Sequence, residues 1–196
     1  MNKRSKKMSN KTLPGRLRIV AGKWRSRLLR IADVPGLRPT SERVRETVFN
    51  WLAPHIAGAR CLDLFAGTGA LGLEALSRGA ASAVFVETSR KAAEALVANI
   101  EAIEAGEAAT VIRKDAFELL RGNIQGPFDI VFLDPPFAAE SAGELCRLLA
   151  AGSLLAEGAL VYLEEDRAKP AAEIPDSWQV LKTKTAGNVR FSLLGV

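Results

Sequence analysis

The sequence CLDLFAGTGALG at residues 61–72 decides the fold predicted for this chain. Its first part, residues 61–65, is an apolar run typical of a buried parallel strand. Three glycines follow, and we expect them to open a helix that continues through Arg78. A glycine loop between a strand and a helix lets a ligand approach the backbone closely. The stretch therefore predicts a strand, a ligand-binding loop and a helix in succession.

Strands and helices alternate after this unit. We predict further strands at residues 83–87, 109–112, 128–133 and 159–164, helices from a Ser89 cap to about Ile103 and at 141–150, and a final hairpin of 178–182 and 189–194. Alternating β and α elements with right-handed crossovers imply a doubly wound α/β sheet. The final hairpin adds an antiparallel edge strand.

The basic charge is concentrated at the N-terminus. The chain has 196 residues, is 48% hydrophobic and can bury one substantial core. Residues 1–30 hold eleven Lys and Arg and no Asp or Glu, whereas residues 31–196 hold 16 basic and 22 acidic residues. A basic segment of this kind suits a polyanion, either nucleic acid or an anionic membrane surface, although residues 1–12 alone could be a solubilising tail.

Targeting signals and cysteines point to the cytoplasm. The N-terminus lacks the apolar region of a secretory signal, which leaves a transit peptide as the weaker alternative. No segment approaches the roughly 20 apolar residues of a membrane span. Cys61 and Cys146 lie in apolar contexts, as expected of a reduced protein. No cluster of side chains has metal-ligand spacing, so we expect no metal.

We divide the chain into a basic disordered tail (1–16), a small β-hairpin (17–35) and a main domain (36–196). Basic side chains and Trp24 lie on the polar face of the hairpin, a combination that could bind phosphates and bases. For Trp24 itself we favour the alternative that it packs on the main domain. The candidate nucleic-acid-binding residues are Arg18, Lys23, Trp24, Arg25, Arg27, Arg38, Thr40, Arg43 and Arg45.

A helix is expected after Thr40 or Ser41, either of which can cap it. Its apolar face consists of Val44, Val48, Phe49, Trp51 and Leu52. The arginines around its start could hold phosphates, although a solvated surface is the commoner role of any single arginine.

Acidic residues end successive strands. Glu87, twenty residues after Gly67, could accept hydrogen bonds from ribose hydroxyls. Asp115 could meet an adenine amino group, and Asp63 could hold a cationic amino-acid group. Each could instead be a simple strand-end cap. The candidate cofactor-binding residues are Asp63, Phe65, Gly67, Thr68, Gly69, Glu87, Asp115 and Ala116.

Two adenosine-containing cofactors compete for this pocket. NAD needs the loop N–H groups for its pyrophosphate, whereas S-adenosylmethionine (SAM) has no phosphate and carries positive charge. An acid as close to the glycines as Asp63 favours SAM.

Residues 134–137, DPPF, follow the strand at 128–133 and supply the candidate catalytic residues Asp134, Pro135, Pro136 and Phe137. The Asp134 carboxylate and a carbonyl of the stiff Pro-Pro turn are acceptors that could bind an amino group on a nucleobase. The Phe137 ring could stack on the base. The alternative is an ordinary turn with a capping Asp.

DLFAGTG (63–69) and DPPF (134–137) resemble motifs of class I SAM-dependent methyltransferases. LRIVAGKWR (17–25), GLRPT (36–40), RVRETVFNWL (43–52) and GLEALSRGA (72–80) resemble the bacterial RsmD family over nearly the whole chain after residue 16. The resemblance implies a Rossmann-like, seven-stranded methyltransferase sheet with a small N-terminal hairpin. It also implies methylation of the N2 amine of one guanine in 16S rRNA, in the small ribosomal subunit or its assembly intermediate. The glycines, Glu87 and Asp115 would then contact SAM, and residues 134–137 the target base.

Other functions stay open on the sequence alone. The same tetrapeptide serves DNA adenine and protein amine methyltransferases. A non-catalytic RNA-binding assembly factor and a nicotinamide-dependent reductase are further alternatives. We expect a monomer without an obligate protein partner.

Overall fold

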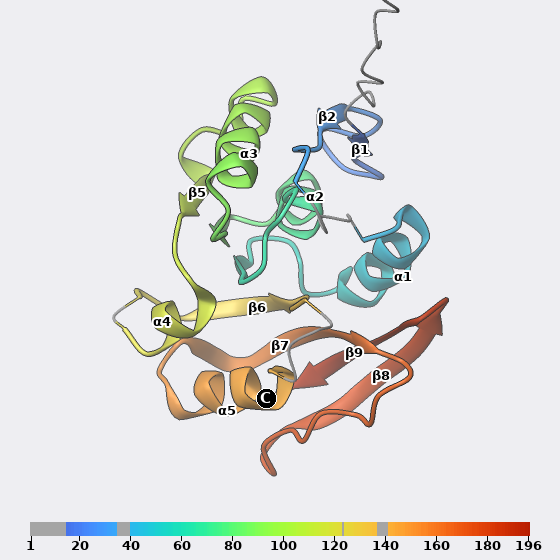
Figure 1. Cartoon of the computed structure of the whole chain (residues 1–196), viewed down its shortest axis with the longest axis vertical. Coiled ribbons are helices and arrows are strands. Elements are labelled where there is room, and N and C mark those ends of the chain that lie inside the picture. Colours follow the sequence, from blue (N-terminus) through green and yellow to red (C-terminus); the bar gives the residue numbers. More distant parts are fainter. Residues whose placement is uncertain (1–14, 35–39, 123, 137–140) are drawn as a thin grey trace, which may run out of the picture.

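The computed structural model describes residues 15–34, 40–122, 124–136 and 141–196 (Figure 1). Its elements in chain order are β1 (Arg16–Arg18), β2 (Leu28–Arg30), α1 (Glu42–Leu52), β3 (Arg60–Asp63), α2 (Ala70–Ser77), β4 (Ser82–Val86), α3 (Arg90–Ala102), the 3₁₀ turn η1 (Gly106–Ala108), β5 (Ala109–Ile112), α4 (Ala116–Leu120), β6 (Phe128–Leu133), α5 (Ala142–Ala151), β7 (Leu155–Asp166), β8 (Gln179–Ala186) and β9 (Val189–Gly195).

Seven strands form one sheet in the order β5-β4-β3-β6-β7-β9-β8. The first five in this order are parallel, whereas β9 pairs antiparallel with both β7 and β8. The prediction of a doubly wound sheet with antiparallel pairing at one edge is confirmed. The strand that runs against the others, β9, is inserted between β7 and the outermost strand β8.

Helices cover both faces of this sheet and create two hydrophobic cores. Helices α1, α2 and α3 pack on one face, and α4 and α5 pack on the other (Figure 1). In β6, Ile130 and Phe132 belong to the first core, and Val131 and Leu133 to the second. Because successive strand residues point to opposite faces, a strand covered on both sides is apolar throughout.

The glycine loop gives α2 its position on the sheet. Gly69 has a φ of +77° at the N-cap of α2, a conformation that glycine adopts readily. A Cβ on Gly72 would lie 2.2 Å from Cε1 of Phe85 on β4. The third glycine therefore allows the helix to approach the neighbouring strand closely.

The predicted hairpin is present, with short strands: β1 and β2 pair antiparallel from Arg16↔Arg30 to Arg18↔Leu28. Arg16 belongs to β1 rather than to the predicted tail, and residues 1–14 of that tail lie outside the described residues. Side chains of α2 and α3 hold the hairpin. Ser77 Oγ accepts from the Trp24 N–H at 3.0 Å, and the Asn99 amide exchanges two hydrogen bonds with the backbone of Arg30.

Two short elements and the lengths of several strands differ from the sequence prediction. The helix α4 and the turn η1 were not predicted because neither is long enough to show a hydrophobic period. Strands β7 and β8 are longer than predicted, spanning twelve and eight residues, and β3 is shorter, spanning four. Across the part of the chain that the structure describes, every helix is too short or too polar to cross a lipid bilayer.

Candidate active site

The predicted site residues meet at one edge of the sheet. Asp63 ends β3, Glu87 follows β4, Asp115 lies just past β5 and Asp134 follows β6. Because these four strands are parallel, their carboxyl ends face the same side. That edge is where open α/β sheets bind ligands.

Two of these acids hold the glycine loop. Glu87 accepts hydrogen bonds from the Gly67 N–H at 2.8 Å and from the Ser89 N–H at 2.6 Å. Asp63 Oδ2 accepts from the Gly72 N–H at 3.1 Å, next to the start of α2. Both carboxyls therefore lie against the loop that was predicted to receive a cofactor.

The remaining cofactor candidates border the same loop and the next strand end. Thr68 is buried and Phe65 is half-buried. Asp115 caps α4, since its Oδ1 accepts from the N–H groups of Phe117 and Glu118 at 2.9 and 3.1 Å. Ala116, the first residue of α4, is buried. Asp115 thus has the capping role that was considered as an alternative, and this role occupies one of its two oxygens.

Asp134 is half-buried at the end of β6, followed by a buried Pro135 and an exposed Pro136. Phe137 lies outside the described residues. Among those residues, one side-chain hydrogen bond reaches Asp134, from Thr40 Oγ1 to Oδ2 at 3.5 Å. Burial, and then the charges of Glu164 and Asp63, raise the pKa of Asp134 well above its usual range, against the effect of the Thr40 hydrogen bond.

Sequence reasoning missed Glu164, which lies on β7 beside Asp134. The register pairs Leu133 with Leu163, so the residues that follow them are level with each other. Glu164 is 4% exposed and accepts a hydrogen bond of 2.6 Å from the hydroxyl of Tyr162. The signal was available, since Glu164 ends the predicted fifth strand as Glu87 ends the second.

Asp63, Asp134 and Glu164 form what we call the strand-end acid cluster. Burial raises the pKa of Asp63 to about 7, partly offset by the N–H groups of Gly72 and Phe65. Burial also raises the pKa of Glu164, and the hydroxyls of Tyr162 and Thr40 act in the opposite direction. Carboxyls shift in this way when burial is not balanced by a nearby cation.

The candidate nucleic-acid-binding residues fall into two groups. The first group is exposed to solvent and consists of Arg18, Lys23, Arg25, Arg27 and Arg43. Within it, Arg18 forms a loose ion pair of 3.6 Å with Glu42. Arg38 lies outside the described residues.

Trp24 and Arg45 do not fit the predicted role. Trp24 is 7% exposed, so its ring is not a free stacking surface, and the expectation that it packs on the main domain is correct. Arg45 is 1% exposed and donates to Glu74 Oε2 at 3.1 Å, to the Arg18 carbonyl at 2.8 Å and to the Thr40 carbonyl at 3.2 Å. The prediction that Arg45 binds phosphate is therefore wrong, because a buried carboxylate already pairs with its charge.

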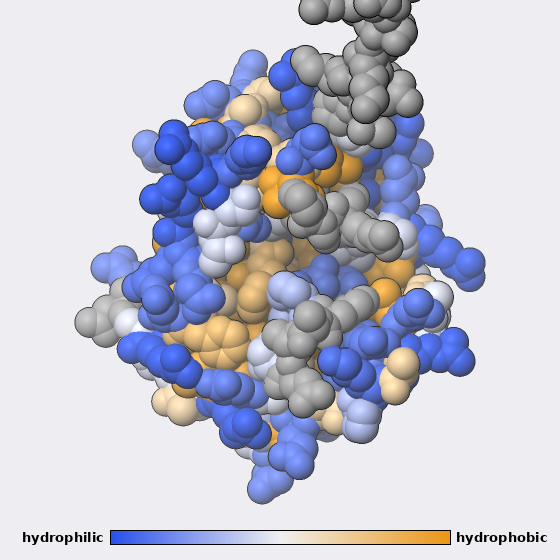
Figure 2. All heavy atoms as spheres, in the orientation of Figure 1, coloured by the Kyte–Doolittle hydropathy of each residue, from blue (hydrophilic) through white to orange (hydrophobic). Residues whose placement is uncertain are grey.

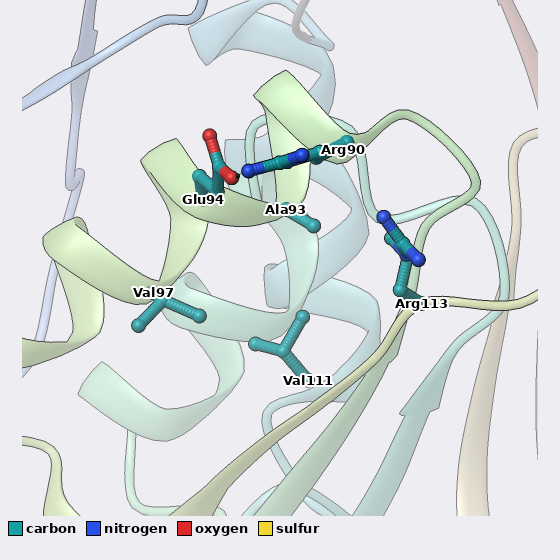
Figure 3. Close-up of a pocket in the computed structure, with 6 residues that line it drawn as sticks. All are labelled: Arg90, Ala93, Glu94, Val97, Val111 and Arg113. Atoms are coloured by element: carbon teal, nitrogen blue, oxygen red, sulfur yellow. Dashed lines mark hydrogen bonds and ion pairs between the residues drawn. The ribbon is translucent and has the colours of Figure 1, made fainter.

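The molecule also has a surface hollow that none of the four strand-end acids lines. Hydrophilic residues surround the visible face of the molecule, and hydrophobic ones gather near its centre (Figure 2). A shallow hollow between α3 and β5 is shown in Figure 3, lined by Arg90, Ala93, Glu94, Val97, Val111 and Arg113. Its one pair of opposite charges, Arg90 and Glu94, is joined at 2.7 Å, and we assign it no role in the site.

A family model, two relatives and a solved structure each match nearly the whole chain. The family described as "Conserved hypothetical protein 95" matches residues 17–195. The chain is 44% identical to ribosomal RNA small subunit methyltransferase D of Escherichia coli (strain K12), over 95% of this chain and 93% of the relative. The identity to the Haemophilus influenzae protein of the same name is 42%, over 96% and 98%. The solved structure of the Escherichia coli yhhF protein superposes with a TM-score of 0.85 at 42% identity, over 92% of this chain and 98% of that one.

Proposed function

The chain belongs to the RsmD family of ribosomal RNA small subunit methyltransferases, and we propose that it transfers a methyl group from SAM to the N2 amine of a guanine in 16S rRNA. The observation that carries this proposal is the position of Asp134. Its half-buried carboxyl lies beside Asp63, which itself contacts the glycine loop. A methyl donor at the loop and an amine at Asp134 would therefore be neighbours.

The residues at the strand ends suit SAM better than NAD. SAM supplies an electrophilic methyl group on a positively charged sulfur. Buried carboxyls that repel one another are stabilised by a nearby cation, whereas a pyrophosphate would add negative charge to the same edge. We propose that Asp63 contacts the amino-acid part of SAM and Glu87 its ribose, since these carboxyls accept from the Gly72 and Gly67 N–H groups. Asp115 retains one oxygen for the adenine.

Asp134 and the Pro135 carbonyl would orient the guanine amine. The N2 lone pair is delocalised into the ring, so the free amine is a poor nucleophile. Hydrogen bonds from N2 to these two acceptors would turn the lone pair toward the methyl carbon and stabilise the positive charge that develops on nitrogen. The N–C bond forms as the C–S bond breaks, and the electron pair of that bond stays on sulfur. One N2 proton then leaves to Asp134 or to water.

The hairpin supplies a surface for the RNA. Its exposed cations, Lys23, Arg25 and Arg27, lie on a unit that α2 and α3 hold firmly. Phosphate contacts of this kind fix the position of a nucleic acid without reading its sequence. The target base would leave its stack to reach Asp134. A ribosomal substrate also implies a cytoplasmic protein, which we propose acts as a monomer.

The test is methyl transfer from labelled SAM to small ribosomal subunits, naked 16S rRNA, DNA and protein, followed by nucleoside mass spectrometry. We expect label in 16S rRNA, as N2-methylguanosine at one position. Label in DNA adenine or in protein would support the alternative amine substrates. Absence of transfer to any of them would favour a non-catalytic assembly factor.

A further inference from the structure

Glu164 and Asp134 are a pair of acids at the same level of the sheet. They follow the register pair Leu133↔Leu163 on the adjacent parallel strands β6 and β7. The charge of Glu164 raises the pKa of Asp134. The Thr40 hydroxyl, 3.5 Å from Asp134 Oδ2, acts to lower the pKa of both carboxyls. The mechanism proposed above uses Asp134 and leaves Glu164 without a role.

Asp134 and Glu164 can accept more hydrogen bonds than the described residues donate to them. An ionised carboxylate has about four lone-pair positions and no donor. Among the described residues, Asp134 receives one hydrogen bond, at 3.5 Å, a length at the outer limit of such bonds. Glu164 receives the Tyr162 hydroxyl at 2.6 Å on Oε1. A short bond on one oxygen orients the carboxyl and leaves the other oxygen for a further donor.

Guanine carries adjacent donors that match this pair. Its N2 amine lies next to N1–H on the same edge of the ring, and flipped bases are read by hydrogen bonds to that edge. In adenine, the atom next to the amine is an unprotonated N1, an acceptor. A carboxylate facing that atom would place two acceptors against each other.

We propose that Glu164 accepts the N1–H of the target guanine while Asp134 accepts the N2 amine, so that Glu164 selects guanine among amine-bearing purines. This inference rests on the proposed function and adds a specificity-determining residue to it. Thr40, whose hydroxyl acts on both acids, would give up that place to the base. Tyr162 would act as a positioning residue, because it reaches the base only through Glu164.

A purely structural role of Glu164 as the buried partner of Tyr162 makes a different prediction. Removing such a partner would lower the stability of the protein, or would lower turnover by the same factor for every substrate. A specificity role changes the ratio between two substrates, and that ratio does not depend on how much enzyme is folded.

The experiment compares 16S rRNA fragments that carry either guanine or 2,6-diaminopurine at the methylated position. 2,6-Diaminopurine keeps the N2 amine but has an unprotonated N1. At a pH high enough to ionise Glu164, whose pKa burial raises, we expect kcat/KM of the wild-type protein for diaminopurine to be about 100-fold lower than for guanine, since a carboxylate would face an acceptor. In Glu164→Gln the amide can donate to N1, and we expect the ratio to fall to within about threefold.

Glu165→Gln is the matched control. Glu165 is the next residue on β7, and its carboxyl pairs with Arg190 at 3.2 Å. We expect this variant to keep the wild-type ratio. Equal use of both substrates by the wild-type protein, or a proportional loss on both in Glu164→Gln, would overturn the role of Glu164 and leave the proposed function standing. Absence of transfer to guanine itself by the wild-type protein would overturn both.

Discussion

Among the described residues, carboxylates are buried at two sites whose surroundings differ. Glu74 on α2 is fully buried and receives four hydrogen bonds: from the Val20 and Ala21 N–H groups at 2.8 and 3.0 Å, from Arg45 at 3.1 Å and from Arg78 at 2.8 Å. Two of these donors are arginines. The chain itself therefore satisfies this acid, and the acid ties the hairpin, α1 and α2 together.

The strand-end acid cluster has different surroundings. Within the described ranges, none of Asp63, Asp134 and Glu164 forms an ion pair with Lys or Arg. Burial raises the pKa of all three. A buried charge that is paired by the chain belongs to the architecture, whereas buried acids without a cation are typical of a functional site. We therefore propose that a ligand completes the strand-end acid cluster.

The largest effect is expected at Asp134. Asp134→Ala removes the acceptor for the amine and should lower turnover on small subunits by about 10²–10³-fold or more, with SAM affinity retained. Asp134→Asn keeps an acceptor oxygen and should retain measurable turnover. Because the wild-type carboxyl has a raised pKa, wild-type kcat should increase as the pH rises and the carboxylate forms. The asparagine variant should lose that dependence. Undiminished activity of the alanine variant would refute the role of Asp134.

Removing Glu74, whose charge the chain itself pairs, should instead lower the stability of the protein. Glu74→Ala leaves Arg45 buried without its partner, and we expect the free energy of unfolding to fall by about 3–5 kcal/mol in denaturant titrations. Glu94→Ala is the control, because it breaks an exposed pair with Arg90 and should leave stability nearly unchanged. Similar values for the two variants would mean that Glu74 is not a structural centre.

Asp63 should make stability depend on pH. Its pKa rises from 3.8 unfolded to about 7 folded, so the folded protein holds the extra proton between these values. Stability is therefore lost as the pH rises through this range, at about 1.4 kcal/mol per pH unit from this group. Asp63→Asn, which can still accept from the Gly72 N–H, should show a shallower fall. Parallel stability curves for the two proteins would contradict the shifted pKa.

The smallest effect concerns the hairpin surface. Reversing the charges of Arg25 and Arg27, both exposed, should weaken rRNA binding about tenfold at low salt and less at high salt, without loss of stability. The matched control is reversal of Arg147 on α5, which packs on the other face of the sheet. An unchanged affinity at low salt would exclude the hairpin as a docking surface.

Periodicity and strand-end chemistry predicted most of the fold and part of the site. The apolar runs indicated the parallel strands because the central ones are buried on both faces, as the split of Ile130 and Val131 of β6 between two cores shows, whereas the edge strand β5 is only partly buried. The acids at strand ends indicated the edge where they meet. That these acids share one edge follows from the parallel pairing of their strands.

Tertiary contacts decided what the sequence left open. Arg43 and Arg45 are equivalent in a sequence pattern, yet Arg43 is exposed and Arg45 is buried against Glu74, a residue 29 positions away. Glu164 lies beside Asp134 because the sheet order places β7 next to β6. Neither fact follows from local periodicity, since both depend on which elements become neighbours.

Proton release on SAM binding is the most direct test of the claim that a cation binds at the strand-end acid cluster. Titration calorimetry at pH 6 in two buffers of different ionisation enthalpy measures this quantity. Asp63 is largely protonated at that pH, and a bound cation should ionise it, so the wild-type protein should release close to one proton. Asp63→Asn should release markedly less. Binding with no proton release by the wild-type protein, or with the same release by both proteins, would contradict the account.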